Sequence, residues 1–333
     1  MEELQAAASQ AAGTILQNEK EASAKKLLQQ TALIIVNYNT TQLTLSAVRS
    51  LLQQDAGLSI IIVDNCSDDN AKELLEKAFS ESSSVHLIFA DKNYGYAVGN
   101  NIGIDYAGEL GTIRFVGIMN PDVEVSPSTL AALAAALEEH DEIGLITAKT
   151  YFNGVDTTPN LCAWRTPKLA NLLLFCTTPA FVWSRLLKKL HKDFNDQNYY
   201  GDEHYAGKDI AFVDVVQGCF FMSKLETMSS VGSFDKETFL YFEENILAAK
   251  IKNRHKINAV LTKEYIRHNH QIKEKKLTKL KNKIFAISCM NTSRCYYIEK
   301  YCSFHPAVKK LLLCFFKADF KIRMLGVKLL YRG

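Results

Sequence analysis

Between residues 31 and 150, short continuous apolar runs alternate with longer amphipathic segments. Runs such as ALIIVN (32–37) and SIIIVD (59–64) are apolar at nearly every position, which is typical of strands buried on both faces of a sheet. The segments between them, for example TLSAVRSLLQQ (44–54), have the period of helices that cover such a sheet. This alternation predicts an α/β fold with a mostly parallel sheet flanked by helices.

Residue types also indicate where individual elements begin. Ser126 is expected to cap a helix with Pro127 at its first position, and Asp68 or Asp69 is placed to cap an earlier helix. Residues 151–212 are expected to form long loops over a site. Downstream, FVDVVQGCFFMSK (212–224) is expected to be a strand, and the acidic turn in ETFLYFEEN should lead into a helix.

The chain divides into three segments: 1–30, 31–270 and 271–333. The first is rich in Ala, Gln, Glu and Lys and is expected to be a solvated lead-in helix; a helix that packs on a partner, or on a second copy in a homodimer, is the alternative. The second is the α/β domain. The third is basic and helical, with six lysines and one glutamate in residues 273–283. Its mixture of basic and apolar residues favours an anionic membrane surface, whereas helices simply packed on the domain are the alternative.

Composition excludes several classes of protein. The 333 residues are 47% apolar, enough for a large core, and the net charge of +3 gives no reason to expect nucleic-acid binding. The eight cysteines form no CxxC pair, so we expect reduced, buried thiols. The acidic start has no secretory signal, and the most apolar window, 169–183, is too short to span a bilayer. We therefore expect a cytoplasmic protein, with peripheral attachment to the inner face of the cell membrane through its basic end.

Polar residues follow the predicted strands at the point where each one ends. Ligands of open α/β sheets bind beyond the carboxyl ends of parallel strands, so this row predicts a binding rim. Its members are Asn37, Asn39, Asp64, Asn65, Asn93, Asn120 and Asp122.

Several motifs occur in the order found in family 2 glycosyltransferases. They are VNYN, IIIVDNCSDD, NYGYAVGNNIGI, MNPDVEV, VVQGCFFMSK, VGSFDKETFLYFEEN and RHNHQ. The chain resembles that family over about residues 31–300, and most of all its rhamnosyltransferase-like branch. The resemblance implies a GT-A fold with a Rossmann-like nucleotide-binding half, and sugar transfer from a nucleotide-sugar donor with inversion.

The resemblance also implies a divalent cation, Mg²⁺ or Mn²⁺, that screens the donor diphosphate. The family's Asp-x-Asp motif reads Asn120-Pro121-Asp122 here, so Asp122 is the first candidate ligand and weak cation binding is expected. Glu124 is the second, because in an extended segment it would share a face with Asp122. A histidine beyond the acidic block approaches the metal in relatives; His268 is preferred and His270 is the alternative.

By the same resemblance, Asp64 lies near the base and ribose of the donor, with Asn37 and Asn39 close by. A carboxylate can accept hydrogen bonds from either group, whereas helix capping is its structural alternative. In NYGYAVGNNIG, Asn93, Gly95 and Asn101 are expected to shape the donor cleft, since glycine permits close approach of the backbone to a ligand.

The catalytic candidates lie in YFEEN. Transfer to a hydroxyl requires a base, and Glu244 occupies the position of the family's acid, with Glu243 placed to orient the acceptor. The alternative is an acidic helix N-terminus favoured by the helix dipole. A further family acid is replaced by Ile246. Trp164 and Arg165 are weaker candidates for stacking on a sugar and pairing with phosphate.

Together the motifs predict an inverting, metal-dependent glycosyltransferase that moves a sugar, with thymidine-diphosphate rhamnose as one donor, onto a glycan or lipid-linked saccharide in cell-surface polysaccharide synthesis. Two alternatives are open. One is an inactive homologue that binds nucleotide-sugar or scaffolds a synthesis complex. The other is a nucleotidyltransferase, which is disfavoured because VNYNTTQ lacks the Gly-rich basic loop such enzymes carry after the first strand.

Overall fold

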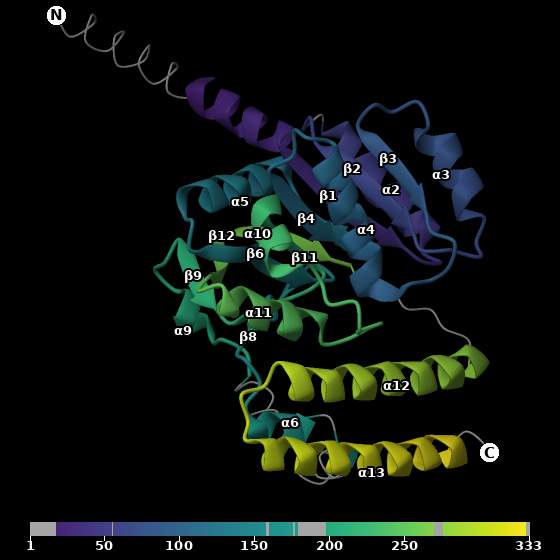
Figure 1. The fold of residues 1–333 in the computed structure, drawn as a ribbon. Helices are drawn as coiled ribbons and strands as arrows, with labels where there is room; N and C mark the ends of the chain where they lie inside the picture. The colour runs from purple at the N-terminus through teal and green to yellow at the C-terminus, as the bar shows by residue number, and fades with distance from the viewer. Residues whose placement is uncertain are drawn as a thin grey trace, which may run out of the picture.

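The structure, a computed structural model, is built around one large mixed sheet with helices on both faces (Figure 1). Strands of the sheet follow the order β3-β2-β1-β4-β11-β6-β12-β5. The residues described by the structure are 18–54, 56–157, 160–175, 177–178, 198–269 and 276–330.

The first half of the chain has the regular alternation expected from its sequence. Its elements are β1 (Thr31–Asn37), α2 (Thr41–Gln53), β2 (Ser59–Asp64), α3 (Ala71–Phe79), β3 (Val85–Phe89), α4 (Gly95–Glu109), β4 (Phe115–Met119), β5 (Val123–Glu124), α5 (Pro127–Glu139) and β6 (Ile143–Phe152). Strand β1 pairs in parallel with β2 and β4, and β2 pairs in parallel with β3. The predicted α/β fold is confirmed.

The second half is less regular. Its elements are β7 (Val155–Asp156), β8 (Ala163–Trp164), α6 (Leu169–Phe175), α9 (Asp202–Tyr205), β9 (Ile210–Val213), β10 (Val215–Val216), β11 (Phe220–Lys224), α10 (Leu225–Val231), α11 (Glu243–Asn253), β12 (Ile257–His268), α12 (Lys276–Lys300) and α13 (Pro306–Leu330). Residues 151–212 therefore contain short strands and helices as well as loops.

The single strand expected over 212–224 is wrong, because this run is divided among three strands with different partners. Strand β9 pairs with β12, β10 pairs with β8, and β11 lies antiparallel between β4 and β6. The breaks fall at Asp214 and at Gln217-Gly218. The second break carries a turn to the edge of the sheet where β4 ends.

The apolar runs are explained by a core on each side of the sheet. In β1, Leu33 and Ile35 face the cluster covered by α2, α3 and α5, whereas Ala32 and Ile34 face the cluster covered by α4, α10 and α11. All four are fully buried. Alternating side chains thus enter two different cores, which explains why these central positions of the strand are all apolar.

One predicted helix cap is confirmed and the other is wrong. The Thr129 N–H donates to Ser126 Oγ at 3.1 Å, and Pro127 stands at the first position of α5. Helix α3, in contrast, is preceded by Asn70 in a left-handed conformation without a side-chain cap. Asp69 instead accepts hydrogen bonds from the N–H and hydroxyl of Thr41, at 3.2 and 2.8 Å, at the start of α2.

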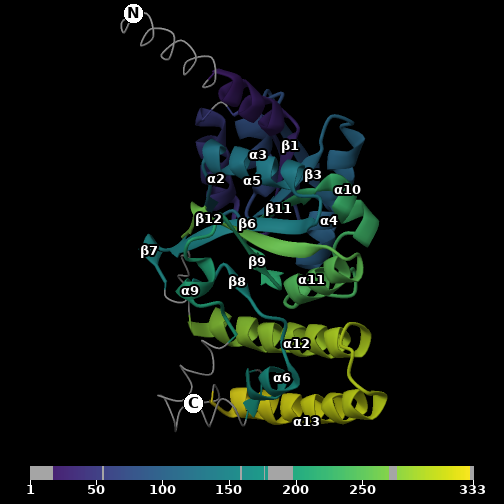
Figure 2. The same ribbon diagram turned by 90° about the vertical axis from the view of Figure 1, so that its left-hand side faces the viewer.

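Helices α12 and α13 form a hairpin beneath the sheet, with α12 on the inner side and α13 on the outer side in both views (Figures 1 and 2). The helical end expected from the sequence is thus confirmed for residues 276–330. The hairpin packs on α6 and on the beginning of α11 through a third apolar cluster. Its buried members are Leu172, Phe242, Ile246, Tyr297, Ile298, Leu312 and Phe316.

At the other end of the molecule, residues 18–29 are helical and bury Leu28, while the rest of the expected lead-in helix, residues 1–17, lies outside the described residues. No helix within the described ranges has both the length and the apolar character needed to cross a bilayer. The seven cysteines that the structure describes are all free thiols.

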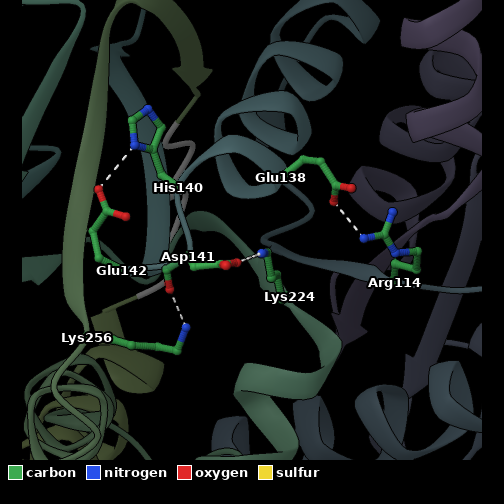
Figure 3. Close-up of polar contacts among 7 residues, drawn as sticks. All are labelled: Arg114, Glu138, His140, Asp141, Glu142, Lys224 and Lys256. Atoms are coloured by element: carbon green, nitrogen blue, oxygen red, sulfur yellow. Dashed lines mark hydrogen bonds and ion pairs between the residues drawn. The ribbon is translucent and has the colours of Figure 1, made fainter.

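The amino-end edge of the sheet carries exposed ion pairs (Figure 3). Arg114 meets Glu138 at 2.6 Å, and Lys224 meets Asp141 at 2.5 Å. At least one partner of each pair is exposed to water, which screens the attraction, so such pairs contribute little to stability. This edge therefore has the chemistry of a solvated surface, whereas the polar row predicted from the sequence lies at the opposite edge.

Candidate active site

A cavity of about 590 Å³ lies at the carboxyl ends of β1, β2 and β4. This volume is within the range of small-molecule sites. Its polar lining includes Asn65, Asn93, Asn100, Asn120 and Asp122. Helix α12 contributes Asn282 and Phe285, and the Phe285 ring meets Phe239 edge to face at 5.5 Å between centroids. The C-terminal hairpin is therefore part of the cavity wall.

Asn37 and Asp64 are both buried and join the ends of β1 and β2. The Asn37 amide nitrogen donates to Asp64 Oδ1 at 2.8 Å, and its carbonyl oxygen accepts from the Thr44 hydroxyl at 2.8 Å. Asp64 also accepts from the Ser67 hydroxyl at 2.6 Å and borders a separate, shallow cavity beside α3. Asn39 is exposed and left-handed, and its side chain accepts from the Asp68 N–H at 2.8 Å.

Asn65, which follows Asp64, was predicted as part of the binding rim, and it lines the cavity. Its amide donates to Asn93 Oδ1 at 2.9 Å and to the Gly95 carbonyl at 3.0 Å. Gly95 has a φ of +83°, and a Cβ there would lie 2.4 Å from the Phe239 carbonyl oxygen. The close approach of the Phe239 segment to α4 therefore requires glycine.

Asn101 does not line the cavity. Its side-chain amide forms two hydrogen bonds, at 3.0 and 2.9 Å, with the backbone of Phe234, and so fixes the segment that precedes α11. The neighbouring Asn100 lines the cavity instead. In a helix, adjacent residues point in directions about 100° apart, so a motif alone does not indicate which asparagine faces the ligand.

Asp122 and His268 lie together at the cavity edge. The distance from His268 Nε2 to Asp122 Oδ1 is 3.3 Å, and the exposed fractions of the two side chains are 8% and 16%. Strand pairing explains their proximity, since β12 pairs antiparallel with β5 and His268 lies opposite Val123. His270 lies outside the described residues.

An oxygen and an imidazole nitrogen that converge in this way suit Mn²⁺, and the carboxylate suits Mg²⁺. No cluster of three or more His, Cys, Asp or Glu side chains of metal-binding geometry occurs in the described part of the chain. The donor set fits a cation that takes its remaining ligands from a diphosphate and water.

Glu124 does not share the cavity of Asp122, contrary to the expectation from strand alternation. It borders a different cavity and accepts a hydrogen bond from the Asn269 amide at 2.8 Å. The reason is local, because the Val123 N–H donates to the Asn120 carbonyl at 3.1 Å and closes a turn. Asp122 therefore lies in the turn, outside the extended segment in which alternation applies.

Glu243 and Glu244 begin α11 after two left-handed residues, Tyr241 and Phe242. Glu243 is 4% exposed, and its Oε1 has no hydrogen-bond partner among the described residues. Burial, with the charge of Glu244 second, raises the pKa of Glu243 to about 8. Burial also raises the pKa of the half-buried Glu244, although the Gly218 N–H acts in the opposite direction. At neutral pH the buried Glu243 is therefore the natural carrier of a proton.

The turn at Gly218-Cys219 connects the two acidic regions. A Cβ on Gly218 would lie 2.5 Å from Glu244 Oε1, and the Gly218 carbonyl accepts a 2.6 Å hydrogen bond from the hydroxyl of Tyr96, which lines the cavity. Burial, then the charges of Asp122 and Glu244, raise the pKa of Cys219. The turn therefore lies between Glu244 and the cavity that Asp122 lines. Sequence reasoning missed this turn, whose only signal was a glycine inside an apolar run.

Aromatic residues lie beside Glu244. The Trp164 indole donates to Asn245 Oδ1 at 3.1 Å, and burial, then the Glu244 charge, raise the pKa of Tyr199. Arg165 lies over the Tyr200 ring at 4.5 Å. Ile246 is buried in the cluster beneath the hairpin. The position that is acidic in the family thus serves packing here.

These observations define an α/β protein with a ligand cavity at the carboxyl ends of its parallel strands and acidic side chains on two sides of one turn. The chain belongs to glycosyl transferase family 2, whose family model matches residues 32–202. The family predicted from the sequence is confirmed; the comparisons do not distinguish its rhamnosyltransferase-like branch.

Other likenesses are more distant. Over 108 residues the chain is 27% identical to the low-salt glycan biosynthesis hexosyltransferase Agl10 of Haloferax volcanii. This matched stretch covers 32% of each of the two proteins. The chain thus spans about a third of that relative's length. The structure of GalNAc-T7 with UDP, GalNAc and Mn²⁺ is similar with a TM-score of 0.53 and 14% identity, covering 88% of this chain and 54% of that one. This likeness supports the GT-A-type fold. S. aureus TarS 1–349 gives a TM-score of 0.48 at 15% identity, covering 86% and 70% of the two chains.

Proposed function

We propose that the protein is an inverting glycosyltransferase that takes a sugar from a nucleotide-diphosphate donor and places it on a hydroxyl of a glycan or lipid-linked saccharide. Family membership supports the reaction class, and the cavity at the strand ends supports a donor of nucleotide-sugar size. The name of the Haloferax relative, a glycan biosynthesis hexosyltransferase, supports a glycan product.

The donor half of the cavity holds the nucleotide. Asn65, Asn93 and Asn100 offer amide groups at its wall, and Asn37 with Asp64 keeps the ends of β1 and β2 in place behind them. Asp122 and His268 would hold a divalent cation beside the diphosphate. Such a cation, when bound, stabilises the negative charge of a departing diphosphate.

Glu244 is the base in this proposal. It accepts the proton of the acceptor hydroxyl while that oxygen forms a bond to the anomeric carbon, from the face opposite the diphosphate. The bond between the anomeric carbon and the diphosphate oxygen breaks, and the diphosphate leaves with the electron pair. The raised pKa of Glu244 suits this task, since a base is most effective when its pKa lies near the working pH.

Glu243 supports the base without exchanging the acceptor proton. With its raised pKa it is neutral at pH 7, so it does not compete with Glu244 for the proton and can donate one hydrogen bond. Trp164, which donates to Asn245 next to Glu244, offers an apolar ring to an acceptor sugar. We assign the acceptor to this side of the Gly218-Cys219 turn.

One observation carries the proposal: the cavity lined by Asp122 is also lined by Tyr96, whose hydroxyl donates to the Gly218 carbonyl, and a Cβ on Gly218 would lie 2.5 Å from Glu244 Oε1. The test is a thermal-shift screen of the protein against nucleotide-sugars, with and without Mn²⁺, followed by turnover assays on the donors that bind. Thymidine-diphosphate rhamnose and uridine-diphosphate hexoses come first. Release of nucleoside diphosphate in step with sugar transfer supports the proposal, whereas pyrophosphate release would indicate nucleotidyl transfer.

A second candidate is a homologue that binds nucleotide-sugar without transferring it. Asn120 replaces the first acid of the metal motif, and Ile246 fills a core position where the family has an acid. Donor binding without transfer to any acceptor, and without donor hydrolysis, would favour this role.

A further inference from the structure

Helix α13 lies along the outer edge of the molecule, separated from the sheet by α12 (Figures 1 and 2). The inner face of α13 is packed against the rest of the protein. Leu312 and Phe316 are buried in the hairpin cluster, and the Arg294 guanidinium lies over the Phe316 ring at 3.7 Å. Asp319 is also buried, and accepts the Thr178 N–H at 2.7 Å. The helix is therefore held in one fixed orientation.

The outer face of α13 carries an apolar stripe. The exposed fractions are 71% for Leu311, 36% for Phe315, 61% for Ile322 and 62% for Leu325. At 3.6 residues per turn these four positions fall within about 80° of arc. Large aliphatic side chains gathered on one exposed stripe indicate a binding surface, whereas single exposed ones would not.

A basic stripe runs beside the apolar one. Its members are Lys310, Lys317, Lys321 and Lys328, all exposed, and their positions fall within about 40° of arc, centred about 100° from the apolar stripe. Helix α13 has six basic residues and one acid, and that acid is the inward-facing Asp319. The outer face therefore has no carboxylate of its own to neutralise the lysines.

We propose that the outer face of α13 binds the surface of an anionic lipid bilayer, with the apolar stripe entering the interface and the lysines meeting lipid phosphates. This is the charge and shape pattern of a helix that lies in the plane of a membrane. A second copy of the chain fits less well, because an antiparallel two-fold contact through this face would bring the two lysine stripes to the same side. The inference does not depend on the proposed reaction.

The test is co-sedimentation of the full chain with vesicles of phosphatidylcholine, with and without roughly one-third phosphatidylglycerol. We expect binding to the anionic vesicles alone, weakened by salt. The double variant Lys317→Glu/Lys321→Glu should bind more than tenfold more weakly, since each basic residue near such a surface strengthens binding roughly fivefold. The matched control is Lys25→Glu/Lys26→Glu, the same charge change on exposed residues of the helix at the other end of the molecule, which should bind as the unmodified protein does.

A third variant separates insertion from simple charge attraction. Leu311→Ser/Ile322→Ser/Leu325→Ser should also lose binding, although its net charge is unchanged. Circular dichroism checks its folding, and the lysine variants carry the test if it fails to fold. The proposal is overturned if the protein ignores anionic vesicles, if both lysine pairs have equal effects, or if the triple serine variant abolishes a dimer seen by light scattering while vesicle binding persists. Glu244→Gln should bind vesicles normally, so failure of the proposed reaction is distinguishable.

Discussion

At the ends of β1 and β2, the side-chain amide of Asn37 is hydrogen-bonded through both its nitrogen and its oxygen, whereas at the start of α11 the Glu243 carboxylate has an oxygen without a partner in the described part of the chain. Both residues are almost fully buried. At the ends of β1 and β2, the buried amide of Asn37 is hydrogen-bonded to Asp64 of β2 and to Thr44 of α2. At the start of α11, two adjacent acids are placed in an environment that raises the pKa of each.

This difference indicates a division of labour. A saturated network has one low-energy arrangement, so it holds the strand ends rigid before any ligand arrives. Unsatisfied buried acids destabilise the fold and are found where chemistry requires a shifted pKa. We therefore assign donor positioning to the β1–β2 side and proton transfer to the α11 side.

The largest effect is expected for Glu244→Gln. Removal of the base should lower kcat by about 10²–10⁴-fold while donor binding is retained. Turnover and donor titration on the same preparation measure the two. Glu226→Gln is the matched control, because it makes the same change at an exposed first-turn position of α10. Glu226→Gln should lose a little stability and no activity. If Glu244→Gln behaves in the same way, the Glu244 carboxylate serves only the favourable interaction with the helix dipole and is not the base.

Gly218→Ala should lower kcat by about 100-fold, because the new methyl group displaces the Glu244 carboxylate and a shift near 1 Å is enough for such a loss. The displaced atoms are the end of a flexible side chain, so the melting temperature should change little. Gly108→Ala in α4, where a Cβ would meet nothing within 4 Å, is the control. A loss of stability in step with the loss of activity would show that Gly218 serves folding alone.

Substitution of Asn37 sharpens the donor side of the comparison. Asn37→Ala should lower the free energy of unfolding by about 3 kcal/mol, since it leaves the buried Asp64 and Thr44 without their partner. Asn37→Asp, which has the same shape, should cost more, because it places a second carboxylate against Asp64. Denaturant unfolding measures both. A variant that unfolds like the original protein would show that the network contributes no rigidity.

The smallest effect is a gain of stability from Glu243→Gln. A folded-state pKa raised from 4.5 to about 8 means that the folded protein binds more protons than the unfolded chain in this interval. The stability that depends on protonated Glu243 is thus fully present below pH 4.5 and is lost as pH rises towards 8. Relative to the unmodified protein, Glu243→Gln should be more stable at pH 8 and no more stable at pH 4. The exposed Glu237→Gln should show no such pH-dependent difference; equal behaviour of the two variants would contradict the assignment.

The sequence predicted the donor half of the fold well, because ALIIVN and SIIIVD must be buried on both faces and the helices between them can only cover those faces. The site was harder to predict. Glu124 was expected beside Asp122, but a turn hydrogen bond at Asn120 removes the alternation on which that expectation relied. The turn at Gly218 was not predicted, because Gly218 lies within an apolar run that was expected to be one strand and that folds as three. The position of a side chain that depends on contacts between distant segments cannot be predicted from the local sequence pattern.

The most direct measurement is a crystal structure of the protein with Mn²⁺ and a nucleoside diphosphate, either uridine or thymidine diphosphate, with the ion located by anomalous scattering. We expect one manganese ion about 2 Å from an Asp122 oxygen and a His268 nitrogen. Its other ligands should include diphosphate oxygens, with the nucleoside in the cavity walled by Asn65 and Asn100. A nucleotide bound in the separate cavity beside α3, or an ion that contacts neither Asp122 nor His268, would contradict it.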